Sequence, residues 1–184
     1  PPRSTLFPYT TLFRSRLPPN LRKIYDSVEL RGMADLKGTL IFDGKHTWQP
    51  QDVVMTLRNC SGRHDKFPYP VENISGTLTQ NGGDIDVDLT GQAGGNPATL
   101  SGHIRNPGPA AEVFYTIHAD RMSLDNSVGA ACPSELQKAL AALKLKGDAT
   151  ADLTVYRPAG LDQKFAIKVS ARLTDASLEF VHFP

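Results

Sequence analysis

The sequence lacks several features that mark common classes of protein. A membrane-spanning helix needs about 18 consecutive apolar residues, and no apolar run in this sequence approaches that length. Its 20 basic and 19 acidic residues are interspersed and leave a net charge of +1, so no charged surface of the kind that attracts nucleic acid is expected. We therefore predict no spanning helix within this stretch and no nucleic-acid partner.

Cysteine is also scarce. Cys60 and Cys132 are the two cysteines, and neither belongs to a CxxC pair or to a Cys/His spacing typical of metal ligands. The spacing leaves two interpretations open, a disulfide between them or two buried thiols. Buried thiols are favoured, because unpaired cysteine behaves as a small apolar residue.

Recognisable catalytic patterns are missing as well. The five histidines are dispersed and form neither HxH nor HExxH. Asp84, Asp86 and Asp88 alternate along one segment, which favours a solvated strand face over a calcium loop, because a straight row cannot wrap a cation. Residues 91–95 (GQAGG) are typical of a turn more than of a phosphate-binding loop, since no Lys-Ser/Thr follows. We predict no enzyme activity, metal or cofactor. The alternative, ranked below the two non-enzymatic interpretations given at the end of this subsection, is a fragment of an enzyme whose active site lies outside this stretch.

What the sequence does contain is a long segment that occurs twice. Residues 18–40 (PPNLRKIYDSVELRGMADLKGTL) align with residues 133–155 (PSELQKALAALKLKGDATADLTV), about 115 residues later. After one inserted residue the alignment continues from 57–61 to 173–177. We therefore expect one complete β-rich unit over residues 17–131 and the first half of a second, truncated unit over residues 132–184.

Residues 1–16 have no counterpart in the second copy. The string PPRSTLFPYTTLFRS at 1–15 resembles a translated sequencing-adapter tail, and it lacks the apolar core of a signal peptide. We expect a non-native or disordered leader here, with a native edge strand as the alternative.

From residue 28 onward, apolar and polar residues alternate in the two-residue period of β-strands. Turn sequences such as Asn81-Gly82-Gly83 separate the alternating segments. Residues 133–143 have a helical apolar stripe that includes Leu136, Leu140 and Leu143, and residues 19–27 form a weaker copy. The pattern predicts a mainly β fold: an antiparallel meander in a curled sheet of repeated units, with one short α-helix opening each unit.

Several motifs together resemble a known family. They are a helix that opens with PxxL, a strand with xLxGxAxL spacing, the stretch FPYPVENISGTL at 67–78, a Gly-rich hairpin, and the closing segment ADRMSLD at 119–125. In this combination residues 17–184 resemble the repeating units of the AsmA-like envelope proteins of diderm bacteria, which include the TamB-type members. The resemblance implies an elongated, curled sheet with a concave apolar groove and no catalytic motif.

The function that the resemblance implies is phospholipid transfer between inner and outer membranes. It further implies a periplasmic location, an inner-membrane anchor outside this fragment, phospholipid acyl chains as ligands, and an outer-membrane protein as a further partner. The positions that alternate inward are the predicted lining of the groove: Leu36, Leu40, Leu78, Ile85, Val87, Leu89, Val113, Ile117, Ile167 and Val169. The alternative is a structural or interaction module in which the same face closes as a β-sandwich. Alternation alone does not separate the two, because both bury one face.

Overall fold

The computed structural model describes most of the chain from residue 26 onward. The described residues are 26–42, 44, 48–65, 67–124, 126–131, 137–138, 142 and 146–177. The expected leader, most of the helix expected at 19–27, Cys132, His46 and His182 lie outside the described residues.

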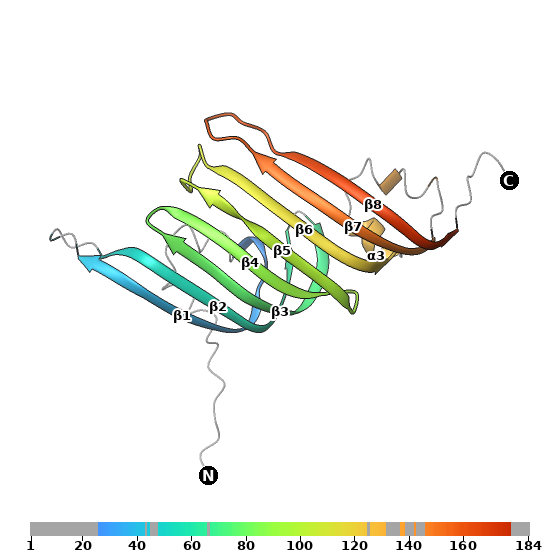
Figure 1. The fold of residues 1–184 in the computed structure, drawn as a ribbon, viewed down its shortest axis with the longest axis horizontal. Helices are drawn as coiled ribbons and strands as arrows, with labels where there is room; N and C mark the ends of the chain where they lie inside the picture. The colour runs from blue at the N-terminus through green and yellow to red at the C-terminus, as the bar shows by residue number, and fades with distance from the viewer. Residues whose placement is uncertain are drawn as a thin grey trace, which may run out of the picture.

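Eight strands form one antiparallel sheet in which every strand pairs with its neighbours in sequence (Figure 1). The strands are β1 (Arg31–Phe42), β2 (Trp48–His64), β3 (Phe67–Asn81), β4 (Asp84–Ala93), β5 (Asn96–Arg105), β6 (Glu112–Ser123), β7 (Lys146–Arg157) and β8 (Ala166–Ser177). The sheet is open, with β1 and β8 at its edges. The predicted mainly β, antiparallel meander is confirmed.

The tight turns follow from glycine. Gly82 and Gly83 connect β3 to β4, and Gly94 and Gly95 connect β4 to β5. Gly94 and Gly95 have φ of 60° and 82°, a conformation that twists in the same sense as the flanking strands and that other residues rarely adopt. The GQAGG stretch is thus the end of β4 followed by a turn, and β5 follows it.

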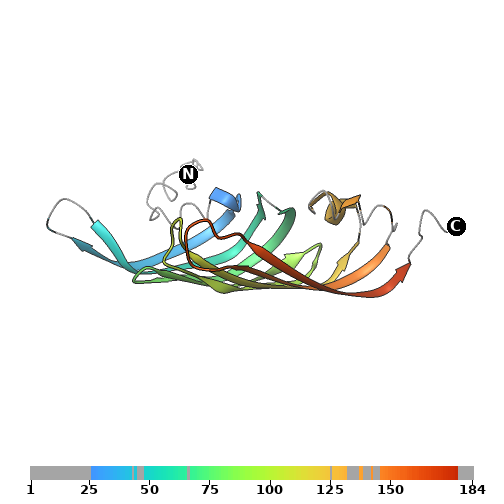
Figure 2. The ribbon, with the colours of Figure 1, turned by 90° about the horizontal axis from the view of Figure 1, so that it is seen from above.

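Bulges bend the sheet near one end of its strands. Asn59, Asn73, Arg121 and Asp175 have positive φ, between 44° and 52°, and each lies where the pairing register shifts. An extra residue in one strand increases the local twist and bends that strand. The sheet is accordingly curved, and α3 (Asn126–Ala131) and residues 26–30 lie on its concave side (Figure 2).

The helix α3 is an element that the sequence analysis missed. Its sequence NSVGAA has too few large apolar residues for a helical period to be visible. It is held by packing, because Val128 and Ala131 cluster with Tyr69 and Ala93. Within the predicted helix at 133–143, the structure describes residues 137, 138 and 142, all helical.

The first strand is shorter than the alternation indicated. β1 begins at Arg31, whereas Val28 and Glu29 form a turn. That turn is tied to β2, since the Arg63 N–H donates to the Val28 carbonyl at 3.0 Å and the Asp65 N–H donates to the Ser27 carbonyl at 2.9 Å. Glu29 also pairs with Arg63 at 2.7 Å.

The FPYP stretch lies at the start of an interior strand. Pro68 and Pro70 lie near the start of β3, which lies between β2 and β4 and is not an edge strand. The pairing with β4 begins only at Val71, so both prolines lie where β3 extends past β4. No backbone N–H is needed there on the side of β3 that faces β4, because β4 does not extend that far.

Two strand pairs have the same geometry at aligned positions. β1 and β7 cover the aligned ranges Arg31–Phe42 and Lys146–Arg157. Both pairs have a register shift at their first residues, where Gly32 and Gly147 have φ of 137° and 119°. A Cβ at Gly32 would lie 2.6 Å from the Cα of Cys60, and a Cβ at Gly147 would lie 2.6 Å from the Cα of Ala176. Each glycine therefore permits the same close approach of the neighbouring strand.

Candidate functional site: the apolar face

The register aligns apolar residues across all eight strands. Residues opposite one another in paired strands point to the same face. One row comprises Leu36, Met55, Leu78, Val87, Gly102, Tyr115, Val155 and Ile167. A second row comprises Ala34, Leu57, Gly76, Leu89, Leu100, Ile117, Leu153 and Val169. We call the side that carries these rows the apolar face.

The apolar face is the concave one. Ala93 and Ala98 belong to it, because Ala93 is two residues beyond Gly91, which pairs with Ala98. Ala93 belongs to the cluster that contains Val128 of α3, and Ala98 packs against that cluster. Because α3 lies on the concave side, the two alanines face that side as well (Figure 2). The curvature of the sheet therefore turns the apolar side chains toward one another.

Of the ten predicted lining residues, nine lie on this face. Leu36, Leu78, Val87 and Ile167 share the first row, and Leu89, Ile117 and Val169 share the second. Ile85 and Val113 belong to a third row with Val53 and Ile104. Leu40 is in β1 opposite Pro50, and its side chain falls outside what the structure describes.

Burial divides the face into two parts. The side chains of β2 to β4 form a closed core in which Met55, Leu78 and Ile85 are only 2%, 4% and 0% exposed. Over β5 to β8 a few side chains such as Val113 are buried, but most of the large apolar ones are half-buried or exposed, reaching 61% at Ile167 and 55% at Val169. We call this part the open strip, and its residues are Leu100, Ile117, Leu153, Val155, Ile167 and Val169. Of the predicted lining residues, Leu78, Ile85 and Val87 lie in the core, Ile117, Ile167 and Val169 lie in the open strip, and Leu36, at the β1 edge, is 42% exposed.

The face also contains polar side chains that the sequence analysis passed over, among them Gln80 and Tyr115. Gln80 is 5% exposed, and its Oε1 has no hydrogen-bond partner among the described residues. It lies in the core between Val53 and Ile85. Tyr115 lies opposite Gly102, and burial raises the pKa of its hydroxyl to about 12. Gln80 is two residues beyond Leu78, so extending the alternation would have placed it inward.

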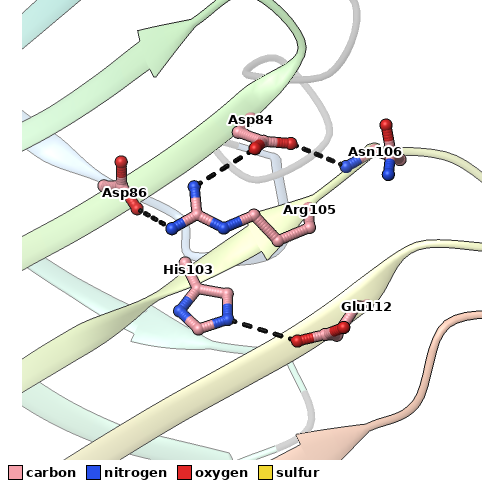
Figure 3. Close-up of polar contacts among 6 residues, drawn as sticks. All are labelled: Asp84, Asp86, His103, Arg105, Asn106 and Glu112. Atoms are coloured by element: carbon pink, nitrogen blue, oxygen red, sulfur yellow. Dashed lines mark hydrogen bonds and ion pairs between the residues drawn. The ribbon is translucent and has the colours of Figure 1, made fainter.

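The opposite face carries charged and hydroxyl groups. Asp84 and Asp86 both bind Arg105, at 3.3 Å and 3.0 Å (Figure 3). Asp84 also accepts a hydrogen bond from the Asn106 N–H at 3.0 Å. The positive charge of the guanidinium thus offsets part of the negative charge of the two carboxylates. The part of the chain that the structure describes has no group of acidic, His or Cys side chains able to hold a metal ion.

The described histidines pair with carboxylates on this polar face or near it. His103 lies 3.5 Å from Glu112 (Figure 3), and His118 lies 2.7 Å from Asp152 in the neighbouring strand. His64 is 3.1 Å from Asp65. The first two are cross-strand pairs, whereas His64 and Asp65 are neighbours in sequence. All three pairs are exposed or half-buried, and pairs of this kind are worth a few tenths of a kcal/mol to about 1 kcal/mol.

The thiol of Cys60 is buried in the core. It is 1% exposed, is not in a disulfide, and donates to the Met33 carbonyl at 3.1 Å. Burial raises its pKa. Cys60 is thus one of the two buried thiols that the sequence analysis favoured, while Cys132 lies outside the described residues.

No helix among the described residues is both long enough and apolar enough to span a bilayer. Comparisons with protein-family models, with curated proteins and with solved structures find no match to this chain.

Proposed function

We propose that this chain is part of a bacterial envelope protein of the AsmA-like kind and that its apolar face holds phospholipid acyl chains in transit between the inner and outer membranes. The observation that carries the proposal is the continuity of the apolar rows over all eight strands of one open, curved sheet. An acyl chain lying across the open strip would contact one apolar side chain after another, from Leu100 in β5 to Val169 in β8.

The open strip supplies the physical reason for a ligand. Monomeric proteins rarely expose a contiguous apolar patch of several hundred Å², and such patches usually mark interaction sites. Ile167 and Val169 are more than half exposed, and Val169 lies in one row with Leu153, Ile117 and Leu100. Covering this surface with hydrocarbon gains about 25 cal/mol per Å² of apolar area. A flexible acyl chain can adapt to a curved row of side chains.

The paired geometry of β1–β2 and β7–β8 supports the repeat-unit part of the proposal. Strand bounds, bulge position and glycine conformation coincide at positions about 115 residues apart. Units of this kind, placed side by side, would lengthen the face without changing its width. The proposal places the parent protein in the periplasm, anchored to the inner membrane, with an outer-membrane protein as a further partner.

The alternative, a β-sandwich module, requires a second sheet about 10 Å from the first. The described residues form a single sheet, which favours the groove. The sandwich therefore becomes an outcome of the test below.

The test compares neighbouring residues of β6 that point to opposite faces. A photo-activated benzophenone amino acid replaces Ile117, on the apolar face, or Thr116, on the polar face. The protein is produced in a diderm bacterium and irradiated, and attached lipid is identified by mass spectrometry. We expect phospholipid adducts at position 117 and none at position 116. Adducts with protein only, or equal lipid labelling at both positions, would contradict the proposal.

A charge at Val87 does not test lipid binding. Val87 is 6% exposed in the closed core, so Val87→Asp strands a carboxylate there and costs several kcal/mol whether or not lipid binds. A substitution that tests lipid binding therefore has to lie in the open strip.

A further inference from the structure

The outer edge of β8 has no partner among the described residues. β8 pairs with β7 on its inner side and is the last strand of the sheet (Figure 1). All of its side chains are exposed, including Val169 at 55% and Leu173 at 44%. A long strand with a free edge and exposed apolar residues readily accepts another strand.

An aligned strand elsewhere in the chain shows how such an edge is covered. β2 aligns with β8, since Ala34 pairs with Leu57 as Ala149 pairs with Leu173, and Arg31 pairs with Ser61 as Lys146 pairs with Ser177. Asn59 and Asp175, at aligned positions, have φ of 51° and 50°. The backbone of β8 therefore has the same course and the same bulge as β2.

The difference between the two strands is the neighbour. β2 is covered on its second edge by β3, and its residues Val53 and Leu57 are 3% and 2% exposed. The aligned residues of β8, Val169 and Leu173, are 55% and 44% exposed. A strand placed on β8 as β3 is placed on β2 would begin to bury both.

We propose that the outer edge of β8 binds one further antiparallel strand of the β3 type, supplied by the later half of a unit of the same kind, in the register that β3 takes on β2. In that register Val169 pairs with the position of Gln80, Ala171 with that of Leu78, and Leu173 with that of Gly76, as follows from the β2–β3 pairs. The added strand would form at β8 the same kind of interface that β3 forms with β2. The inference concerns the backbone edge and holds whether or not the apolar face carries lipid.

The probe is a fluorescent peptide with the sequence of β3, FPYPVENISGTLTQN, added to the full 184-residue chain. We expect saturable binding by anisotropy. Hydrogen exchange measured on the same complex should show new protection in β8 and none in β1. Absence of binding to the folded protein, protection confined to β1, or self-association through β1 and β8 in place of peptide binding would overturn the inference.

Matched substitutions on β8 test the register. Val169→Lys and Leu173→Lys put charges where the added strand would cover apolar surface, and we expect each to weaken binding about tenfold or more. Ile167→Lys is the control. It lies on the same face and strand and is 61% exposed. However, the β2–β3 pairing begins at Asp52, which aligns with Lys168, so position 167 lies beyond the covered region.

Circular dichroism verifies that the three variants remain folded. Equal weakening by Ile167→Lys, or equal binding of a peptide in which Ile74 and Leu78 are replaced by Lys, would show non-specific adhesion and overturn the proposed register. The exchange measurement on the unsubstituted protein decides the outcome even if a variant fails to fold.

Discussion

Two isoleucines on the same face offer a direct test of the division between closed core and open strip. Ile85 in β4 is 0% exposed and belongs to the main cluster, whereas Ile167 in β8 is 61% exposed. Truncating a fully buried isoleucine to alanine removes its transfer free energy and leaves a cavity, which costs about 2–5 kcal/mol. We therefore expect Ile85→Ala to lose a large part of a total stability of about 5–15 kcal/mol.

The same truncation at Ile167 leaves no cavity, because its side chain faces solvent. The expected loss is at most about 1 kcal/mol, from the lower strand propensity of alanine. Equilibrium unfolding in urea, followed by circular dichroism, measures both losses, and equal m-values show that both variants unfold from a similar native state.

The comparison would refute the division if Ile167→Ala cost as much as Ile85→Ala. That result would mean that the β8 part of the face is covered in solution and is not available to acyl chains. A loss below about 1 kcal/mol at Ile85 would mean that the core over β2 to β4 is not closed.

Three further predictions follow from individual side chains. Because the pKa of Tyr115 is raised from 10.0 to about 12, its hydroxyl ionises at lower pH in the unfolded chain than in the folded one. The free energy of unfolding should therefore keep the full Tyr115 contribution below pH 10.0 and fall by up to about 3 kcal/mol as the pH rises to about 12. Urea titrations of Tyr115→Phe should not show this fall. The buried Cys60 thiol, whose pKa is raised, should react with a thiol reagent only as fast as the core opens, so reaction in native buffer as rapid as in urea would contradict its burial. Arg157 donates hydrogen bonds to the carbonyls of Pro109, Ala111, Gly160 and Gln163. Arg157→Lys loses the planar guanidinium that reaches these carbonyls together and should lower the free energy of unfolding by about 1–3 kcal/mol. An unchanged urea midpoint would contradict this prediction.

The sequence by itself determined the strands and their faces. Alternation with a period of two is local, and it identified Leu78, Ile85 and Ile117 as inward positions because the pleat sends successive side chains to opposite faces. Glycine-rich turns are local as well, and they fixed the β3–β4 and β4–β5 hairpins. The antiparallel meander followed from strands joined by short connections.

Only the tertiary structure decided how those faces are covered. Ile85 and Ile167 have the same residue type and the same alternation, yet one is buried and the other exposed, because burial depends on neighbours that are distant in sequence. The same reason applies to α3, which is stabilised by contacts with Tyr69 and Ala93 more than by its own six residues. It applies also to Asp84 and Asp86, which Arg105 reaches only after β4 and β5 pair.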